Sequence, residues 1–401
     1  MQSIISANIK SKTEAEAEKD AMIPYYSASK ALPALGIQFQ KVTPYISFSG
    51  TVAGNSLTFK LPAGSGFLYE SSLSFSCTCA GLSLASGDLL NHVGLGMIRQ
   101  IDWMSNGQPV LTQTGAAIRA LVKTLPVEQQ AFIYRYALPL NPTTEDIAAD
   151  TNTAFLTYTP LIASWLTSVE KDLLLNVIGD LQLRVTFETQ AVTGLSVAIS
   201  LASNGATLYC QTYMPKLSVY NQQIINDWSK TLVMECFNTY TEVVPMSTVT
   251  TVSNYTITCP FLVFRTHVMV ENIVTPATTF RINSITLNVG GVPLLDTYPR
   301  SRTLSLKARS GLGSVEVTNN TALVYDNKDH LIIDWGVHST RDRNVGTAFM
   351  QELRGTVLSI TCETVTTAGN ANMYLVHEYW QDVAFQPGAS GNGRLEVYQN
   401  A

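Results

Sequence analysis

Alternation of apolar and polar residues is the commonest pattern along this chain. It is clearest in residues 57–61, 73–77 and 181–188, and it recurs in 45–49 and 256–259. Because successive side chains of a strand point to opposite faces, a period of two predicts strands with one buried face. Pro, Gly and Asn separate these runs, as expected for turns. We therefore predict an all-β chain.

Helical patterns are few and short. The segment 11–22 is dense in strong helix formers, Ser11 and Glu14 have the spacing of a capping box, and Pro24 ends the pattern. We therefore predict a helical N-terminal arm over 1–36. Three further short helices are predicted, over 115–125, 218–230 and 340–353.

A strand–turn–strand segment occurs twice, at 101–111 and again at 285–295. In each copy a pair of residues that tolerates positive φ angles separates two apolar runs, which is typical of a tight hairpin turn. A proline follows two residues later and opens the return strand. The residues that define the two turns are Asn106, Gly107 and Pro109 in the first copy, and Gly290, Gly291 and Pro293 in the second.

Two later segments also match, in the same order. Residues 183–189 match 358–364, and residues 206–213 match 372–379. Three ordered matches predict two tandem sandwiches of similar plan, and a hairpin followed by a short helix and late strands is typical of an eight-stranded jelly roll. We assign the arm to 1–36, the first jelly roll to 37–222, the second to 223–390 and a C-terminal tail to 391–401.

Composition favours a protein that is buried by neighbours. Apolar residues make up 46% of the chain, whereas charged residues make up only 14%, against roughly 25% in typical soluble proteins. The net charge is −5, and basic residues form no cluster. Because phosphate binding needs clustered Lys and Arg, we expect no specific nucleic-acid binding. A surface rich in Ser, Thr, Asn and Gln suits broad subunit contacts.

Targeting and redox signals are weak. The first ten residues contain no apolar stretch long enough for a signal peptide, and we predict no membrane-spanning helix. The six cysteines include no CxxC pair. We therefore predict buried free thiols rather than a metal or redox site.

Motifs that carry chemistry are almost absent. The sequence has no HxH or HExxH, no phosphate-binding loop and no GxSxG, so we expect no catalytic residue, cofactor or metal site. The best enzymatic candidates are acidic and imidazole side chains close together in the sequence: Asp326, Asp329, His330, Asp334 and His338. They leave open a double-sandwich hydrolase that cleaves amide or glycosidic bonds. A receptor-binding spike or adhesin is a further alternative.

The arrangement resembles a double jelly-roll major capsid protein of the tectivirus–adenovirus lineage, found in tailless icosahedral bacteriophages that often contain a membrane. The duplicated hairpin at 101–111 and 285–295 carries the resemblance, together with 155–165 and 173–188. No single motif is specific, but the arrangement covers most of the chain. The short loops between strands imply that tall towers are absent.

The resemblance implies a homotrimer whose six sandwiches form a pseudo-hexagonal tile of an icosahedral shell. The arm, with Lys10, Lys12 and Lys19, would lie on the inner face, near an internal lipid membrane where one exists. Expected partners are copies of the chain itself and minor capsid and vertex proteins. The expected location is the virion, after synthesis in the host cytoplasm.

Overall fold

A computed structural model describes most of the predicted sandwich regions. The described residues are 35–64, 66–82, 93–122, 124–125, 133, 152–160, 173–188, 199–215, 231–246, 251–272, 280–289, 291–299, 329–335, 351–364, 371–388 and 392–397. The predicted arm up to residue 34, with Lys10, Lys12 and Lys19, lies outside them, as does the predicted helix over 218–230.

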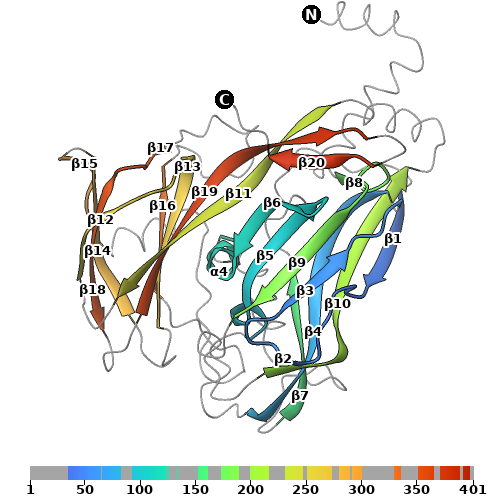
Figure 1. The fold of residues 1–401 in the computed structure, drawn as a ribbon. Helices are drawn as coiled ribbons and strands as arrows, with labels where there is room; N and C mark the ends of the chain where they lie inside the picture. Colours follow the sequence, from blue (N-terminus) through green and yellow to red (C-terminus); the bar gives the residue numbers. More distant parts are fainter. Residues whose placement is uncertain are drawn as a thin grey trace, which may run out of the picture.

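The first half of the chain forms a sandwich of two antiparallel sheets (Figure 1). One sheet has the order β1 (Leu35–Val42), β10 (Ile199–Pro215), β4 (Phe67–Leu82), β7 (Asn152–Pro160). The other has the order β3 (Ser56–Lys60), β9 (Leu181–Phe187), β5 (Ile98–Ser105), β6 (Gln108–Thr114). Two short strands are added to the first sheet, β2 (Gly50–Thr51) and β8 (Leu173–Leu174).

The second half repeats this plan strand for strand. One sheet has the order β11 (Leu232–Met246), β19 (Ala371–Gln386), β13 (Leu262–Asn272), β16 (Asp329–Asp334). The other has the order β12 (Thr251–Thr256), β18 (Val357–Thr364), β14 (Phe280–Val289), β15 (Val292–Pro299). The short strands here are β17 (Gln351–Glu352) and β20 (Arg394–Val397). Two sandwiches with eight main strands each, in the same order, confirm the predicted fold class.

The pairing registers confirm the first two sequence matches residue for residue. If the repeat is real, two residues that pair across strands in the first half must match two residues that pair in the second half. The observed pairs satisfy this requirement: Ile101 with Val185 and Trp103 with Leu183 in the first sandwich, and Ile285 with Ile360 and Leu287 with Leu358 in the second.

The third match holds for the strands but not for their register. Residues 206–213 lie in β10 and 372–379 in β19, which occupy equivalent places in their sheets. However, Leu208 points into the first core, whereas its matched residue Tyr374 packs outside the second core. A slip of one residue reverses the face of every side chain, so the gapless match is wrong by one position.

Three local predictions need correction. The predicted helix over 340–353 is outside the described residues up to 350, and residues 351–352 form β17. Within 45–49, Ile46 makes only an isolated bridge to Thr58. Within 256–259, β12 ends at Thr256: the Ile257 N–H still donates to the Thr356 carbonyl, but the Thr258 and Cys259 N–H groups bond to the Glu242 carboxylate instead of a strand.

Two helices are described. The helix α4 (Gly115–Val122) confirms the prediction over 115–125 and ends three residues earlier than predicted. The short helix α3 (Val93–Gly96) was not predicted and contains the Gly94-Leu-Gly96 fragment. In the part of the chain that the structure describes, no helix combines the length and apolar character that crossing a membrane needs.

The two sandwiches share their packing. In Figure 1, α4 and β6 of the first sandwich lie beside β11 of the second, and α4 contacts both β11 and β19. The larger apolar core contains residues of both halves, among them Phe237 and Phe385. The strand β20 lies in the range that we assigned to a tail, and it pairs with β19. The proposed domain boundaries otherwise stay predictions.

Four described cysteines are buried thiols that form no disulfide bond, as predicted: Cys77, Cys210, Cys236 and Cys259. Burial raises the pKa of Cys210 to about 12 and that of Cys259 to about 11. These thiols are therefore protonated near neutral pH and lack the thiolate character that metal binding or nucleophilic attack requires.

Candidate functional site

The predicted turn residues lie at the tips of two equivalent hairpins. Asn106 and Gly107 connect β5 to β6 with φ angles of 49° and 78°, which is the backbone of a type I′ turn. Gly291 has a φ of 84° between β14 and β15, and Gly290 lies outside the described residues. The prolines open the return strands, with Pro109 paired to Met104 and Pro293 to Asn288.

The predicted acidic cluster is spread along one strand. Asp329, His330 and Asp334 all belong to β16, and Asp326 and His338 lie outside the described residues. At roughly 3.3 Å per residue, Asp329 and Asp334 lie about 16 Å apart along the backbone. The two carboxylates of a glycosidase are about 5–10 Å apart. The backbone of β16 therefore separates these two residues by more than such a pair requires, and no group of metal-ligating side chains occurs among the residues described.

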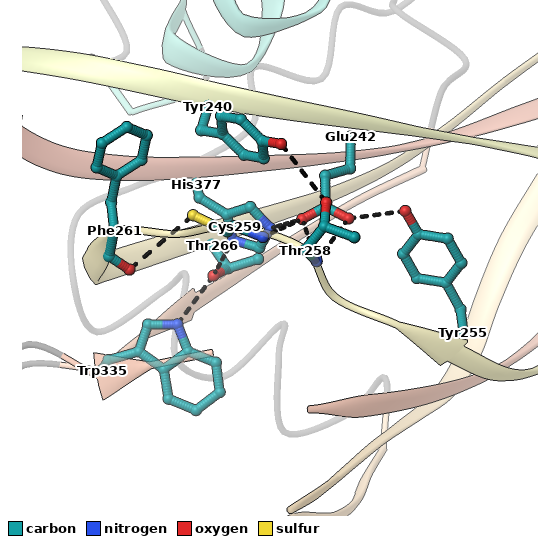
Figure 2. Close-up of polar contacts among 9 residues, drawn as sticks. All are labelled: Tyr240, Glu242, Tyr255, Thr258, Cys259, Phe261, Thr266, Trp335 and His377. Atoms are coloured by element: carbon teal, nitrogen blue, oxygen red, sulfur yellow. Dashed lines mark hydrogen bonds and ion pairs between the residues drawn. The ribbon is translucent and has the colours of Figure 1, made fainter. Parts of the chain in front are cut away.

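A buried polar network occupies the second sandwich instead (Figure 2). Its centre is formed by Glu242 on β11, Thr266 on β13 and His377 on β19. Thr266 pairs with His377 across the sheet, which places both side chains on the face that lines the second core. All three side chains are at most 5% exposed.

Glu242 holds the connection between β12 and β13. Its Oε1 accepts hydrogen bonds from the backbone N–H groups of Thr258 at 3.0 Å and Cys259 at 2.9 Å. Its Oε2 accepts a hydrogen bond from the Tyr255 hydroxyl at 2.7 Å. The carboxylate thus replaces the neighbouring strand that these N–H groups lack.

His377 connects Glu242 to Thr266 and Trp335. Its Nε2 lies 3.6 Å from Glu242 Oε1, an ion-pair distance longer than a hydrogen bond, and its Nδ1 lies 3.1 Å from Thr266 Oγ1. The Trp335 indole, which can only donate, bonds to the same Oγ1 at 2.9 Å. This leaves the Thr266 hydroxyl proton free to point at Nδ1, and the ring proton then sits on Nε2, facing Glu242.

Opposing effects set the pKa of Glu242. Burial alone would raise it, but the nearby His377 ring, the Tyr255 hydroxyl and the Thr258 N–H together hold the pKa of this carboxyl below its ordinary value. Burial and the hydrogen bond to Glu242 raise the pKa of Tyr255. Glu242 is therefore ionised and Tyr255 neutral near pH 7.

The order threonine–histidine–glutamate resembles a nucleophile, a base and an orienting acid. A nucleophile must be reached by its substrate, however, and Thr266 is only 3% exposed. His377 is completely buried as well. The network therefore fits a structural role, in which hydrogen bonds among buried side chains and N–H groups hold β11, β12, β13 and β19 together.

A second buried charged group lies on the opposite face of the same strands. Glu378 contacts His267 directly, and its Oε2 lies 3.7 Å from Arg265 Nη1. This face is turned toward the first sandwich, where α4 packs on Val376. A hydrogen bond of 2.8 Å between the Thr114 and Thr241 hydroxyls also crosses the contact. The interface between the sandwiches is therefore partly polar.

In the first sandwich, the face of the β1–β10–β4–β7 sheet that points away from the core carries exposed apolar side chains. Phe39 on β1 is 74% exposed and Tyr209 on β10 is 43% exposed. Phe39 pairs with Gln211 and Tyr209 with Lys41, so the two rings are diagonal neighbours on one face. We call this pair the β1–β10 patch. In the second sandwich, α4 covers Met269 and Val376 on the corresponding face of the β11–β19–β13–β16 sheet, whereas Val243 on β11 stays exposed.

Comparison with known proteins finds matches in structure but none in sequence. The sequence matches no protein-family model and none of the curated proteins. The capsid of the virus PBCV-1 is structurally similar, with a TM-score of 0.66, 10% identity, and coverage of 92% of this chain and 98% of that chain. The Faustovirus major capsid protein has a TM-score of 0.57 at 8% identity and covers 92% and 94%. The mavirus major capsid protein has a TM-score of 0.53 at 12% identity and covers 92% of each chain. The chain therefore has the double jelly-roll fold of these viral major capsid proteins.

Proposed function

We propose that this chain is a major capsid protein, which assembles with copies of itself into the icosahedral shell of a virion. The observation that carries the proposal is the fold: 92% of the chain aligns with the PBCV-1 capsid, over 98% of that chain. Nearly the whole chain is thus accounted for by the two sandwiches. A bacteriophage origin stays a prediction.

The proposed assembly unit is a homotrimer, a pseudo-hexagonal capsomer of six sandwiches. Within the chain, the first sandwich covers part of the outer face of the β11–β19–β13–β16 sheet through α4. The same face of the first sheet instead carries the exposed β1–β10 patch. Repeating the intrachain contact between chains would cover this patch and generate a ring. Three copies of a two-sandwich chain then supply the six sandwiches.

The β1–β10 patch allows a direct test. The double variant Phe39→Ser, Tyr209→Ser removes two exposed rings and leaves the core residues in place, so we expect a folded monomer that forms no shells. Leu262→Ser is the matched control, because Leu262 is 51% exposed but lies on β13 of the other sandwich. Light scattering reports the mass and electron microscopy the shells. Normal trimers and shells from the double variant would contradict the proposed contact.

The remaining partners belong to the proposal too. The arm over 1–36, with Lys10, Lys12 and Lys19, would lie on the inner face of the shell, near a lipid membrane where one exists. Minor capsid and vertex proteins are expected neighbours, and specific nucleic-acid binding is not expected. A catalytic role is not part of the proposal, since no observation on the described residues favours a hydrolase or an adhesin.

A further inference from the structure

The C-terminal strand β20 completes the sheet of the second sandwich. It pairs antiparallel with β19, from Val397 opposite Val383 to Arg394 opposite Gln386. In Figure 1 it lies along the end of β19, at the side where the first sandwich begins. One edge of this short strand therefore belongs to the second sandwich.

The same segment is hydrogen-bonded to the first sandwich. The Gly393 N–H donates to the Val177 carbonyl at 2.8 Å, and the Gly179 N–H donates to the Gly393 carbonyl at 3.0 Å. The Leu395 N–H donates to Ser105 Oγ at 2.9 Å. Backbone hydrogen bonds thus run from β19 through β20 to the connection between β8 and β9.

Close packing locks the crossing. The Leu395 side chain is buried in the core that also contains first-sandwich residues. A Cβ atom at Gly393 would lie 2.7 Å from the Val177 carbonyl oxygen and closer still to the Phe385 ring. A side chain at this position is therefore incompatible with the observed approach of the two backbones.

The α4 contact between the sandwiches has a different character. It is built from small side chains of α4, Ala116, Ala117 and Ala120, which rest on Met269 and Val376. The alanine side chains are a single methyl group each, and the neighbouring Thr114–Thr241 hydrogen bond links only side chains. Partly polar interfaces between domains permit relative motion unless something else fixes them.

We propose that β20 is a strap that fixes the angle between the two sandwiches. While β20 is attached to both, the sandwiches form one rigid body. When β20 is detached, the α4 and β6–β11 contacts remain, and the sandwiches move relative to each other about them. The strap itself does not depend on the proposed function. Its consequence for shells does rest on that function, because a regular shell requires subunits of one shape.

Gly393→Val tests the strap in the full chain. The valine side chain should expel β20 from the crossing, so the amides of Gly179 and Leu395 should exchange with solvent at least about tenfold faster. Amides of β5 and β13 should keep their protection, and the radius of gyration from X-ray scattering should increase. Arg394→Ala is the matched control, because Arg394 lies in the same strand with a largely exposed side chain.

The outcomes separate cleanly. Unchanged exchange and scattering in Gly393→Val would overturn the proposal. Loss of protection in β5 and β13 together with β20 would also overturn it, because β20 would then be an inseparable part of the core. The milder variant Ser105→Ala, which removes only the bond to the Leu395 N–H, should speed exchange at Leu395 alone.

Shell formation is scored separately. A strap that behaves as proposed in a chain that never forms shells would leave the strap standing and contradict the capsid function. Irregular or absent shells from Gly393→Val, with regular shells from Arg394→Ala, would support both. Gly393→Val could also have an increased radius of gyration and still form regular shells. That result would contradict the proposed link between the strap and shell formation.

Discussion

Histidine and glutamate side chains are buried on both faces of the β13–β19 pair. His377 faces Glu242 inside the second sandwich, and His267 contacts Glu378 between the sandwiches. Sequence patterns identify neither group, because the partners are far apart in the chain: Thr266 and His377, for example, are separated by 111 residues. The one signal in the sequence that could have indicated these buried groups is a polar residue at an inward-facing position of an alternating strand.

Glu242 should make stability depend on pH in acid. Its folded-state pKa is depressed, so its contribution is complete above the ordinary value of 4.5 and is lost as the pH falls below that value. Glu242→Gln should lower the free energy of unfolding at pH 7 by about 1–3 kcal/mol, because buried N–H groups lose a charged acceptor. It should also flatten the acid dependence. Urea unfolding at pH 7 and at acid pH measures both effects.

Glu396→Gln is the control for that substitution, since this carboxylate on β20 is 44% exposed and pairs only with the exposed Arg394 side chain at 2.8 Å among the ion pairs described. It should leave the free energy of unfolding almost unchanged at both pH values. Equal stability and equal acid dependence of wild type and Glu242→Gln would show that the carboxylate does not hold the network.

At the scale of elements, alternation predicted strands best where one face is buried and the other is exposed. β9 alternates between buried and half-buried residues, whereas in β3 Thr58 is buried along with Leu57 and Phe59. The hairpin repeat could be placed to the residue because its turn pairs are distinctive. Alternation failed at 258–259, where Glu242 takes the place of a neighbouring strand. The strap β20 was not predicted, because four residues are too few to show a period and its partners lie in both sandwiches.

The β5–β6 turn should be sensitive to side chains at Gly107. Its φ of 78° is strained for a β-branched residue, so Gly107→Val should lower the free energy of unfolding by about 1–3 kcal/mol. Gln108→Val is the control, because Gln108 is exposed and begins β6 with an ordinary strand backbone. Chemical unfolding of both variants measures the difference. Equal losses would contradict the type I′ assignment.

At the scale of the whole molecule, the two halves are pseudo-equivalent in topology but not in exposure. The helix α4 covers Met269 and Val376 on the outer face of the β11–β19–β13–β16 sheet, whereas the β1–β10 patch on the equivalent sheet of the first sandwich is open. The sequence could not predict this asymmetry, because α4 is more than 100 residues away in the chain from the strands that it covers. It explains why a chain with two similar sandwiches would require further copies to bury its remaining apolar face.

The mass of the purified wild-type chain in solution tests this account most directly. Light scattering behind a sizing column should give three copies of the 43.7-kDa chain, about 131 kDa, or larger assemblies built from that unit. A clean monomer of 43.7 kDa at concentrations where capsid proteins assemble would contradict the proposed capsomer.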